Sequence, residues 1–453
     1  MNQFNRRDFI KSIAAASSAS VLSIPLSSCA STGGAKSATR VVVVGGGYGG
    51  ATAAKYVKML DPKIDVTLIE RNPTYTSCPL SNEVISGERD ISTLQVGYEG
   101  LKKRGINVVQ DDVTAIDSAK KTVTTKSGKT FGYDAAVVSP GVDFNFGAIK
   151  GYSEAAAEIM PHAWKAGPQT LLLKKKLEEM PDGGKFLICV PKGPFRCPPG
   201  PYERAAQVAH YCKTHGKTKA KIIILDANSS FSKKGLFEQA WKELYGYGPD
   251  GMIEWVAGEK GGIVGSCDPA AMTVSTEFDS FKGDVINIIP PHSAGMIAKT
   301  TGLTNEKGWC PAKPETMEST LVPDIYPIGD ACTGGQMPEF AFPKSAHMAM
   351  SQAKVVAAAI VAKANGLPMP VPYYVNTCYS LVAPDYGFSV VHFYRVENGQ
   401  WVYIKEGSGV SPVNFDTKEG DTVVKKPVPK LFRKIEAEYA DGWLRNVLAD
   451  AFA

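Results

Sequence analysis

Several kinds of protein are excluded by what this sequence of 453 residues lacks. It has no Cys-x-x-Cys-His motif to attach a c-type haem and no paired Cys-x-x-Cys spacing, so we expect no metal site. The formal net charge is only +5, and no run of Lys and Arg is interleaved with aromatic residues, which argues against a nucleic-acid partner. No stretch after the first 30 residues approaches about 18 uninterrupted apolar residues, so no membrane-spanning helix is predicted.

The composition that is present indicates a large globular protein. Hydrophobic residues make up 44% of the chain and charged residues 21%, which is ordinary for a folded protein. At roughly 150 residues per domain, the length predicts about three structural units. The nine cysteines are an odd number, so at least one thiol is unpaired or modified if the others pair.

The first 35 residues are typical of an export signal. A twin arginine at positions 6 and 7 precedes a short apolar stretch over residues 13–26, the pattern of a Tat signal for folded, cofactor-bearing proteins. The stretch leads into Leu-Ser-Ser-Cys, which also resembles a lipobox, so Cys29 is either the acylated mature N-terminus or an ordinary leader residue. Either reading predicts a periplasmic protein, where disulfides persist, with membrane contact only if Cys29 is lipidated.

A dinucleotide-binding motif follows the leader. A β-branched run over residues 40–44 leads into a Gly-x-Gly-x-x-Gly motif, an expected helix and a second expected strand that ends at Glu70. In this motif Gly45 permits the tight turn, Gly47 lets the backbone approach a pyrophosphate, and Gly50 lets the helix pack on the strand. The helix N-terminus offers N–H groups to the phosphates, and Glu70 accepts hydrogen bonds from ribose hydroxyls.

A downstream motif indicates which dinucleotide is bound. Residues 325–331 read as a short strand that ends in Gly329-Asp330, and Lys344 precedes an expected helix through Lys363. This resembles flavoproteins with two dinucleotide-binding domains, in which the Asp binds the ribitol of the flavin and the following helix N-terminus faces the isoalloxazine. Because NAD-only dehydrogenases have no use for a Gly-Asp element, the sequence predicts FAD.

The middle of the chain repeats the strand–helix–strand pattern without the glycine fingerprint. Expected strands over residues 185–190 and 221–226 flank an expected helix over 201–215. The loop before this helix is rich in proline, which supplies no N–H groups for a pyrophosphate, so we expect no NADH there. It presents Cys197 ahead of a helix N-terminus, whose dipole favours a thiolate. Glu203 is either an acid that serves this thiol or only a stabilising first-turn residue.

The other cysteines differ in their expected surroundings. Cys189 and Cys212 lie on an expected core strand and helix, where buried inert thiols are common. Cys78 lies on a loop beyond the second strand that can reach the flavin, and Cys378 lies in the last domain. Sequence spacing alone does not pair Cys378 with Cys197. Three further cysteines are either structural or free: Cys267, Cys310 and Cys332.

Six short stretches carry a resemblance to a known family: Leu80–Val84, Met160–Gly167, Phe195–Arg204, Asn287–Pro291, Pro343–His347 and Cys378–Ser380. Over nearly the whole chain after the leader, the sequence resembles the flavoprotein subunit of flavocytochrome c sulfide dehydrogenase. The stretch Phe-Arg-Cys-Pro-Pro-Gly-Pro-Tyr-Glu-Arg is specific to that family, whereas glycine motifs are common.

The resemblance implies roles for particular residues. Cys197 and Cys378 match a redox-active disulfide beside the flavin, and Glu203 matches an acid near that disulfide. Cys78 matches the cysteine bonded through sulfur to the 8α carbon of FAD, although Pro79 after it departs from the family pattern. The implied reaction is attack of hydrosulfide on the disulfide, with electrons passing through the flavin to a c-type cytochrome on another polypeptide.

We therefore expect a glutathione-reductase-like α/β flavoprotein with two dinucleotide-binding-type domains and a C-terminal α+β interface domain. The expected bounds are 1–35 for the signal, 36–150 and 291–362 for a split FAD-binding domain, 151–290 for the second domain and 363–453 for the interface domain.

Two other functions stay open. A sulfide:quinone oxidoreductase shares the fold and the disulfide chemistry but docks on membranes through apolar C-terminal elements. The expected amphipathic helix over residues 429–453 suits either a packed surface helix or a membrane surface. The third candidate is a non-catalytic flavoprotein subunit of a sulfur-oxidising assembly. His162 either lines the flavin pocket or packs at a domain junction.

Overall fold

The computed structural model describes residues 38–333, 342–419 and 422–453. The twin-arginine signal and Cys29 lie outside these residues, so their predicted roles stay predictions. Within the described residues, no helix is long and apolar enough to cross a membrane, and no group of three His, Cys, Asp or Glu side chains could hold a metal ion.

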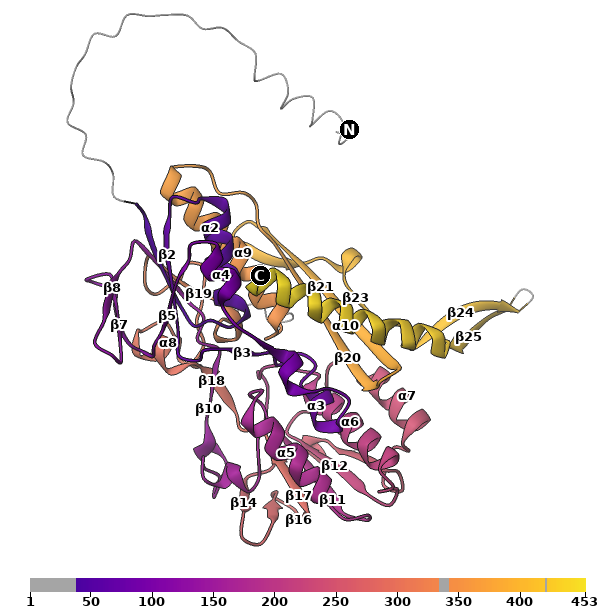
Figure 1. Cartoon of the computed structure of the whole chain (residues 1–453). Helices are drawn as coiled ribbons and strands as arrows, with labels where there is room; N and C mark the ends of the chain where they lie inside the picture. Colours follow the sequence, from indigo (N-terminus) through magenta and orange to yellow (C-terminus); the bar gives the residue numbers. More distant parts are fainter. Residues whose placement is uncertain (1–37, 334–341, 420–421) are drawn as a thin grey trace, which may run out of the picture. The chain divides into compact units, whose positions relative to one another are not determined.

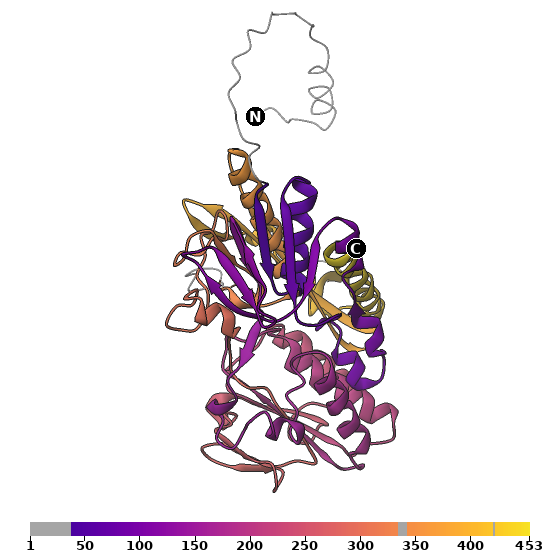
Figure 2. The same cartoon turned by 60° about the vertical axis from the view of Figure 1, so that its left-hand side comes forward.

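A five-stranded parallel sheet carries the first dinucleotide motif (Figures 1 and 2). In spatial order its strands are β19 (Ile325–Pro327), β9 (Ala135–Val138), β1 (Arg40–Val44), β2 (Asp65–Glu70) and β5 (Asn107–Gln110). Four of the five residues of β1 are valines and are buried, as expected for a central parallel strand covered on both faces. The helices α2 (Tyr48–Leu60) and α9 (Ala346–Asn365) pack against each other on this sheet.

Short elements fill the connections of this sheet. Between β2 and β9 the chain forms β3 (Tyr75–Thr76), α3 (Asn82–Ser86), β4 (Gln95–Val96), α4 (Glu99–Lys103) and the antiparallel β6 (Val113–Asp117), β7 (Thr122–Thr125) and β8 (Thr130–Gly132). The antiparallel pair of β10 (Val142–Phe144) and β18 (His292–Ala294) carries the chain out of the first sheet and back to it. The short helix α8 (Met296–Thr300) follows β18.

The central part of the chain forms a second parallel sheet. Its spatial order is β13 (Ile253–Val256), β12 (Lys221–Asp226), β11 (Lys185–Val190) and β17 (Val285–Ile288). Its helices are α5 (Pro168–Glu179), α6 (Gly200–Thr214) and α7 (Lys234–Leu244). A small antiparallel sheet is formed by β14 (Ser266–Asp268), β15 (Thr273–Ser275) and β16 (Ser280–Lys282). The strands β11 and β12 begin and end at the predicted residues, and α6 does so within one residue.

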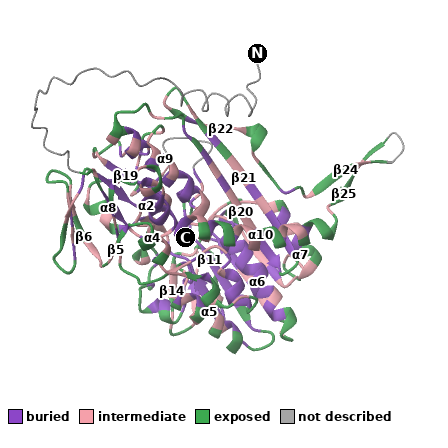
Figure 3. Cartoon of the chain, turned by 45° about the horizontal axis from the view of Figure 1, so that its top comes forward, coloured by how far each residue is buried: buried purple, intermediate pink, exposed green. Residues whose placement is uncertain are grey.

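The C-terminal part combines an antiparallel sheet with a long helix. The sheet contains β20 (Tyr373–Ala383), β21 (Tyr386–Glu397), β22 (Gln400–Tyr403) and β23 (Gly409–Val410). A separate hairpin of β24 (Asn414–Glu419) and β25 (Thr422–Pro427) is largely exposed where its side chains are described (Figure 3). The last helix, α10 (Lys430–Phe452), packs against β21 and α2.

The last helix is tied to the first one by specific contacts. Lys55 on α2 donates from Nζ to the carbonyl oxygens of Ala449 and Asp450 at 3.1 and 3.0 Å. The ring of Phe452 stacks on Tyr75 with a centroid distance of 5.4 Å. The predicted amphipathic C-terminal helix is thus present, and its buried face packs inside this unit of the fold.

Candidate functional site

One large cavity collects residues from the first sheet, the central sheet and the C-terminal strands. Its volume is about 1450 Å³, which exceeds the ~300–1,000 Å³ of common small-molecule pockets and leaves room for a dinucleotide. All predicted site residues except Gly50 line it: Gly45, Gly47, Glu70, Cys78, Cys197, Glu203, Gly329, Asp330, Lys344 and Cys378. Residues far apart in the sequence therefore meet at one site.

The glycine loop after β1 has the close contacts that only glycine allows. Gly45 has φ +92°, and a Cβ there would lie 2.3 Å from the carbonyl oxygen of Ser139. A Cβ on Gly50 would lie 1.8 Å from the oxygen of Gly45, which explains why Gly50 packs beneath the loop and not on the cavity wall. Gly47 caps α2 without any side-chain hydrogen bond. The first N–H groups of α2 are thus left to a ligand in the cavity, and a pyrophosphate fits them.

Glu70 lies at the carboxyl end of β2, beside this loop. One carboxylate oxygen accepts from the backbone N–H of Gly46 at 2.7 Å. The other accepts from the backbone and the side-chain amide of Asn72 at 2.9 and 2.7 Å. A carboxylate oxygen has two lone-pair sites, so Oε2, which accepts only from Gly46, keeps capacity for a ribose hydroxyl, whereas Oε1 is already satisfied by Asn72. The ribose contact itself stays a prediction.

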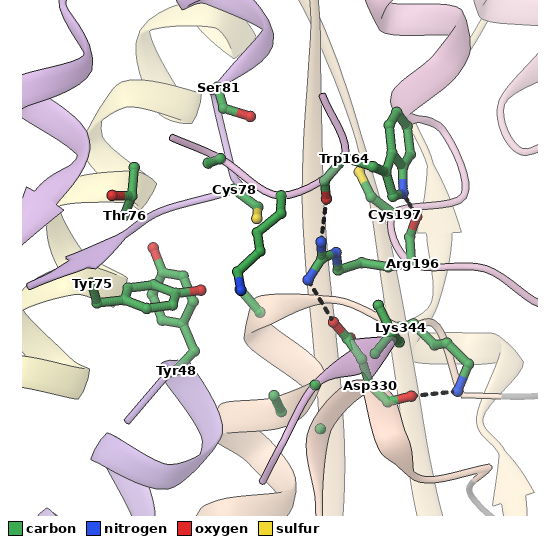
Figure 4. A pocket seen from close by; sticks show the side chains of 18 of the residues that line it. Tyr48, Tyr75, Thr76, Cys78, Ser81, Trp164, Arg196, Cys197, Asp330 and Lys344 are labelled. Carbon is green, nitrogen blue, oxygen red and sulfur yellow. Dashed lines mark hydrogen bonds and ion pairs between the residues drawn. The ribbon is translucent and has the colours of Figure 1, made fainter. Parts of the chain in front are cut away.

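The Gly-Asp turn after β19 lies at the same sheet as the glycine loop, and both approach Ser139. Gly329 adopts φ +73°, and the Asp330 carboxylate lies 3.9 Å from the guanidinium of Arg196, which comes from the proline-rich loop (Figure 4). Burial raises the pKa of Asp330, and the charges of Arg196 and Lys344 oppose that rise. This ion pair links the first and central sheets across the cavity.

Lys344 forms hydrogen bonds with the backbone of the same turn. Its Nζ donates to the carbonyl oxygens of Asp330 and Cys332 at 2.7 and 3.1 Å and lies 3.6 Å from the ring centre of Trp309 (Figure 4). Burial lowers the pKa of Lys344 to about 8. Its ammonium is therefore engaged by backbone oxygens, and direct contact with a cofactor stays a prediction.

Three half-buried thiols share the cavity (Figure 4 shows two of them, Cys78 and Cys197). Cys197 has a left-handed backbone, φ 56°, just before α6, and its N–H donates to the carbonyl oxygen of Lys344 at 2.9 Å. Cys378 lies in the middle of β20. Both are free thiols in the structure, and the charge of a Cys378 thiolate raises the pKa of Cys197. The two predicted disulfide partners thus line one cavity and lie close enough to affect one another electrostatically, and the disulfide itself stays a prediction.

The thiol chemistry of Cys197 differs from the sequence-based expectation. The dipole of α6 led us to expect a stabilised thiolate. Burial instead raises the pKa of Cys197 well above its usual value, and the nearby charges of Cys378, Glu203 and Cys78 raise it further. Desolvation and neighbouring anions outweigh the helix terminus here, because the thiol is enclosed by protein. In the reduced protein Cys197 is therefore a neutral thiol.

Glu203 lies in the first turn of α6, where its carboxylate is almost fully buried. Its Oε1 accepts from the N–H of Leu381 on β20 at 2.9 Å, and its Oε2 accepts from the Asn82 amide at 3.2 Å. Burial raises the pKa of Glu203 to about 7, although these hydrogen bonds and Lys233 oppose the rise. Glu203 can consequently gain or lose a proton near neutral pH beside the two thiols.

A buried arginine network next to Glu203 was missed by the sequence analysis. Arg204 on α6 is 2% exposed and donates to the side-chain oxygens of Asn82 and Asn287 at 3.0 and 2.9 Å. It also donates to the backbone oxygens of His162 and Ala163 at 3.1 and 2.6 Å. The signal was present, because all five of these residues lie in the stretches that carry the family resemblance, yet those stretches do not show which residues form hydrogen bonds with one another.

The structure also shows the surroundings of other residues that the sequence analysis singled out. His162 both lines the cavity and is packed: its Nδ1 accepts from the N–H of Trp164 at 3.0 Å, and burial lowers its pKa to about 3. Cys189 and Cys212 are buried on β11 and α6, as predicted. Cys310 and Cys332 form a β-bridge outside the named strands.

Three family models cover most of the described chain. Residues 39–170 match the pyridine nucleotide-disulphide oxidoreductase model. Residues 170–290 match the central part of the sulfide dehydrogenase [flavocytochrome c] flavoprotein chain. Residues 370–452 match the flavin-binding part of flavocytochrome c sulphide dehydrogenase. The last match agrees with the glycine loop and the Gly-Asp turn in supporting FAD as the cofactor.

Curated relatives give the same family and a neighbouring one. The sulfide dehydrogenase [flavocytochrome c] flavoprotein chain of Chlorobaculum thiosulfatiphilum is 60% identical over 45 residues, which are 10% of this chain and 94% of that sequence. The mitochondrial sulfide:quinone oxidoreductase of Mus musculus is 23% identical over 317 residues, 66% of each chain. The Aquifex aeolicus sulfide-quinone reductase is 33% identical over 144 residues, 32% of each.

Solved structures confirm the predicted fold class. The sulfide:quinone oxidoreductase of Aquifex aeolicus has a TM-score of 0.68 at 20% identity and covers 91% of this chain and 92% of its own. The putidaredoxin reductase–putidaredoxin complex has a TM-score of 0.61 at 15% identity and covers 92% and 100%. The fold is that of flavoprotein oxidoreductases with two dinucleotide-binding domains, and this sulfide-oxidising flavoprotein belongs to the family of the flavoprotein chain of flavocytochrome c sulfide dehydrogenase.

Proposed function

We propose that this chain is a periplasmic sulfide dehydrogenase subunit that oxidises sulfide through a Cys197–Cys378 disulfide and FAD and passes the electrons to a c-type cytochrome. The observation that carries this proposal is the convergence of Cys197, Cys378 and Glu203 on one cavity with the glycine loop of the first sheet. Cys197 and Glu203 come from the loop before α6 and from its first turn, whereas Cys378 comes from β20, far along the sequence. Export through the Tat pathway, with or without lipidation of Cys29, is part of the proposal.

The first chemical step is thiol–disulfide exchange. The sulfur of HS⁻ attacks one sulfur of the Cys197–Cys378 disulfide, a new S–S bond forms, and the bond between the cysteines breaks. One cysteine becomes a persulfide that keeps the hydrogen of HS⁻, and the other leaves with the electron pair as a thiolate. The cavity suits this step because both half-buried cysteines line it.

Glu203 acts in this proposal as the proton acceptor and donor for the incoming sulfide. With a pKa of about 7, its carboxylate is close to half protonated near neutral pH. It can take a proton from H₂S as the reactive HS⁻ forms and return it later to a thiolate. Its two hydrogen bonds, to Leu381 and Asn82, hold the carboxylate in place beside the thiols.

The cofactor is held by residues already described. FAD, when bound, supplies the acceptor for the electron pair and releases electrons singly to a haem. The glycine loop and Asp330 would hold its pyrophosphate and ribitol, and Cys78 would bond to it covalently. Since the sequence has no haem-binding motif, the haem belongs to another polypeptide.

Sulfide:quinone oxidoreductase is the second candidate function. The Mus musculus and Aquifex aeolicus relatives and the Aquifex structure carry this name, and the fold accommodates both activities. The electron acceptor distinguishes the two candidate functions. We expect sulfide to reduce cytochrome c in the presence of the protein far faster than it reduces a quinone analogue. The reverse preference would replace the proposal by the second candidate, and failure with every acceptor despite bound flavin would favour a non-catalytic subunit.

Replacement of the thiols tests the chemistry directly. Cys197→Ser and Cys378→Ser are each expected to abolish sulfide oxidation while flavin stays bound, and Cys267→Ser, at a half-buried cysteine that does not line the cavity, serves as the matched control. Cys78→Ser is expected to release flavin in acid, whereas the parent protein keeps it on the polypeptide. Sulfide turnover, flavin absorbance and acid precipitation are the measurements. Normal turnover in either disulfide variant would refute the proposed reaction.

A further inference from the structure

Lys233 brings a positive charge to the strand that carries Cys378, on the face that the side chains of Cys378 and Ser380 share. Its Nζ donates to the hydroxyl of Ser380 at 2.8 Å and to the backbone oxygen of Cys378 at 3.4 Å. Both acceptors belong to β20. The ammonium lies 5.6 Å from the ring centre of Phe388 on the neighbouring strand β21. The lysine thus reaches from the start of α7 across to the C-terminal sheet.

The backbone of Lys233 has an unusual, left-handed conformation. It precedes α7 as the N-cap residue with φ 62° and ψ 26°, the left-handed region that few residues other than glycine adopt. Its carbonyl oxygen still accepts from the N–H groups of Leu236 and Phe237, so the helix starts normally. An unusual conformation that the surrounding structure maintains is often functional.

The next lysine has a different environment. Lys234 lies over the ring of Trp255 at 4.2 Å and pairs with Glu238 at 3.9 Å. None of the described carboxylates forms an ion pair with Lys233, so its charge acts on the site. Lys234 is therefore a matched control for the charge of Lys233.

We propose that Lys233 sets the direction in which the disulfide opens: its ammonium stabilises Cys378 as the leaving thiolate, so that the sulfur of HS⁻ is added to Cys197. This inference rests on the proposed sulfide oxidation. In the step, the Sγ–Sγ bond breaks, a bond forms between the incoming sulfur and Cys197 Sγ, and Cys378 Sγ takes the electron pair. Lys233 touches no reacting atom and is a positioning residue.

The charges around the two sulfurs agree with this direction. Burial raises the pKa of Cys378, and the charge of Lys233 is the largest effect that opposes the rise, ahead of the adverse charge of Glu203. At Cys197, the charges of Cys378, Glu203 and Cys78 each raise the thiol pKa by more than the charge of Lys233 lowers it. The pKa of Cys197 is therefore raised well above its usual value, with burial as the largest cause. His392 on β21 lines the same part of the cavity, and burial and Lys233 lower its pKa, so it is neutral near pH 7.

Thiol alkylation tests the inference without sulfide. The reduced holoenzyme is treated with iodoacetamide over a range of pH, and peptide mass spectrometry follows Cys378 and Cys197 separately. In Lys233→Met, we expect alkylation of Cys378 to be about tenfold slower at a given pH, corresponding to a thiol pKa about one unit higher. Lys233→Arg is expected to keep the parent profile, and so is Lys234→Met.

A second measurement locates the persulfide. One equivalent of sulfide is added to the oxidised parent protein, the products are trapped with iodoacetamide, and the trapped persulfide is expected on the Cys197 peptide. Flavin absorbance reports folding, and Lys233→Gln replaces Lys233→Met if the latter loses flavin. Unchanged alkylation of Cys378 in the folded variant, or a persulfide on Cys378 in the parent, would overturn the inference. A shifted alkylation profile in a protein that does not oxidise sulfide would overturn the proposed function alone.

Discussion

The loops after β1 and after β11 occupy the same place in two parallel sheets but differ in chemistry. The first is made of glycines, and its close contacts leave backbone N–H groups to a ligand. The second is rich in proline and presents a thiol at Cys197 and a guanidinium at Arg196, and the carboxylate of Glu203 follows in the first turn of α6. One strand–loop–helix unit therefore suits an anionic cofactor, and the other suits sulfur chemistry. The comparison shows that the fold sets the position of a loop, whereas its residues set what the loop binds.

The largest effect is expected from breaking the first loop. In Gly50→Val a side chain is forced to within 1.8 Å of the Gly45 oxygen, so the turn cannot close and the holoprotein should not form. Flavin content after purification and the unfolding midpoint are the measurements. Gly265→Ala is the control, because a Cβ at Gly265 meets nothing within 4 Å. A flavin-loaded Gly50→Val protein would show that the tight packing of this loop is dispensable.

A smaller but substantial effect is expected from the support of the second loop. Arg204→Met removes four hydrogen bonds and leaves the oxygens of Asn82 and Asn287 without this donor. We expect a loss on the order of 4 kcal/mol in the free energy of unfolding, measured with denaturant. Arg445→Met, a surface change at a side chain 74% exposed, should cost less than about 0.5 kcal/mol. Equal costs for the two variants would contradict the role given to Arg204.

The smallest effect is expected from the carboxylate of Glu203, in the helix turn that follows the second loop. The folded pKa of Glu203, about 7, lies above the ordinary value of 4.5, so near neutral pH the folded state holds a proton that the unfolded state has lost. Its contribution to stability is complete below pH 4.5 and falls by about 3 kcal/mol as the pH rises to 7. Glu203→Gln should remove this slope. Denaturant unfolding at pH 5 and pH 8 measures it, with the exposed Glu179→Gln as the control that keeps the slope. An identical pH dependence in Glu203→Gln would mean that the carboxylate is ordinary.

Local patterns predicted several elements at their observed positions and identified residues that line one cavity, although their roles stay predictions. The strands β11 and β12 were found at the expected residues, because apolar runs bounded by charged residues and prolines define them clearly. The glycine loop and Cys197 share the predicted cavity. Such features depend on near neighbours in the sequence, and a family resemblance supplies the distant partner, Cys378.

Long side chains and local electrostatics were not predictable in this way. The ammonium of Lys344 is turned to backbone oxygens, and that of Lys233 reaches another sheet, because each lysine has several rotatable bonds and tertiary contacts choose among their states. The thiolate expected at Cys197 was wrong for a related reason. Burial depends on the whole fold and here exceeds the effect of one helix terminus.

The wall of the cavity is built from segments that a ribosome makes early, midway and late. The glycine loop emerges first, Cys197 follows with α6, and β20 brings Cys378 only after α9 has been synthesised. A nascent chain that ends before β20 would expose the glycine loop without the strand that completes the site. The proposed Cys197–Cys378 disulfide therefore requires a chain that has been synthesised past β20, and a product terminated before that strand would lack it.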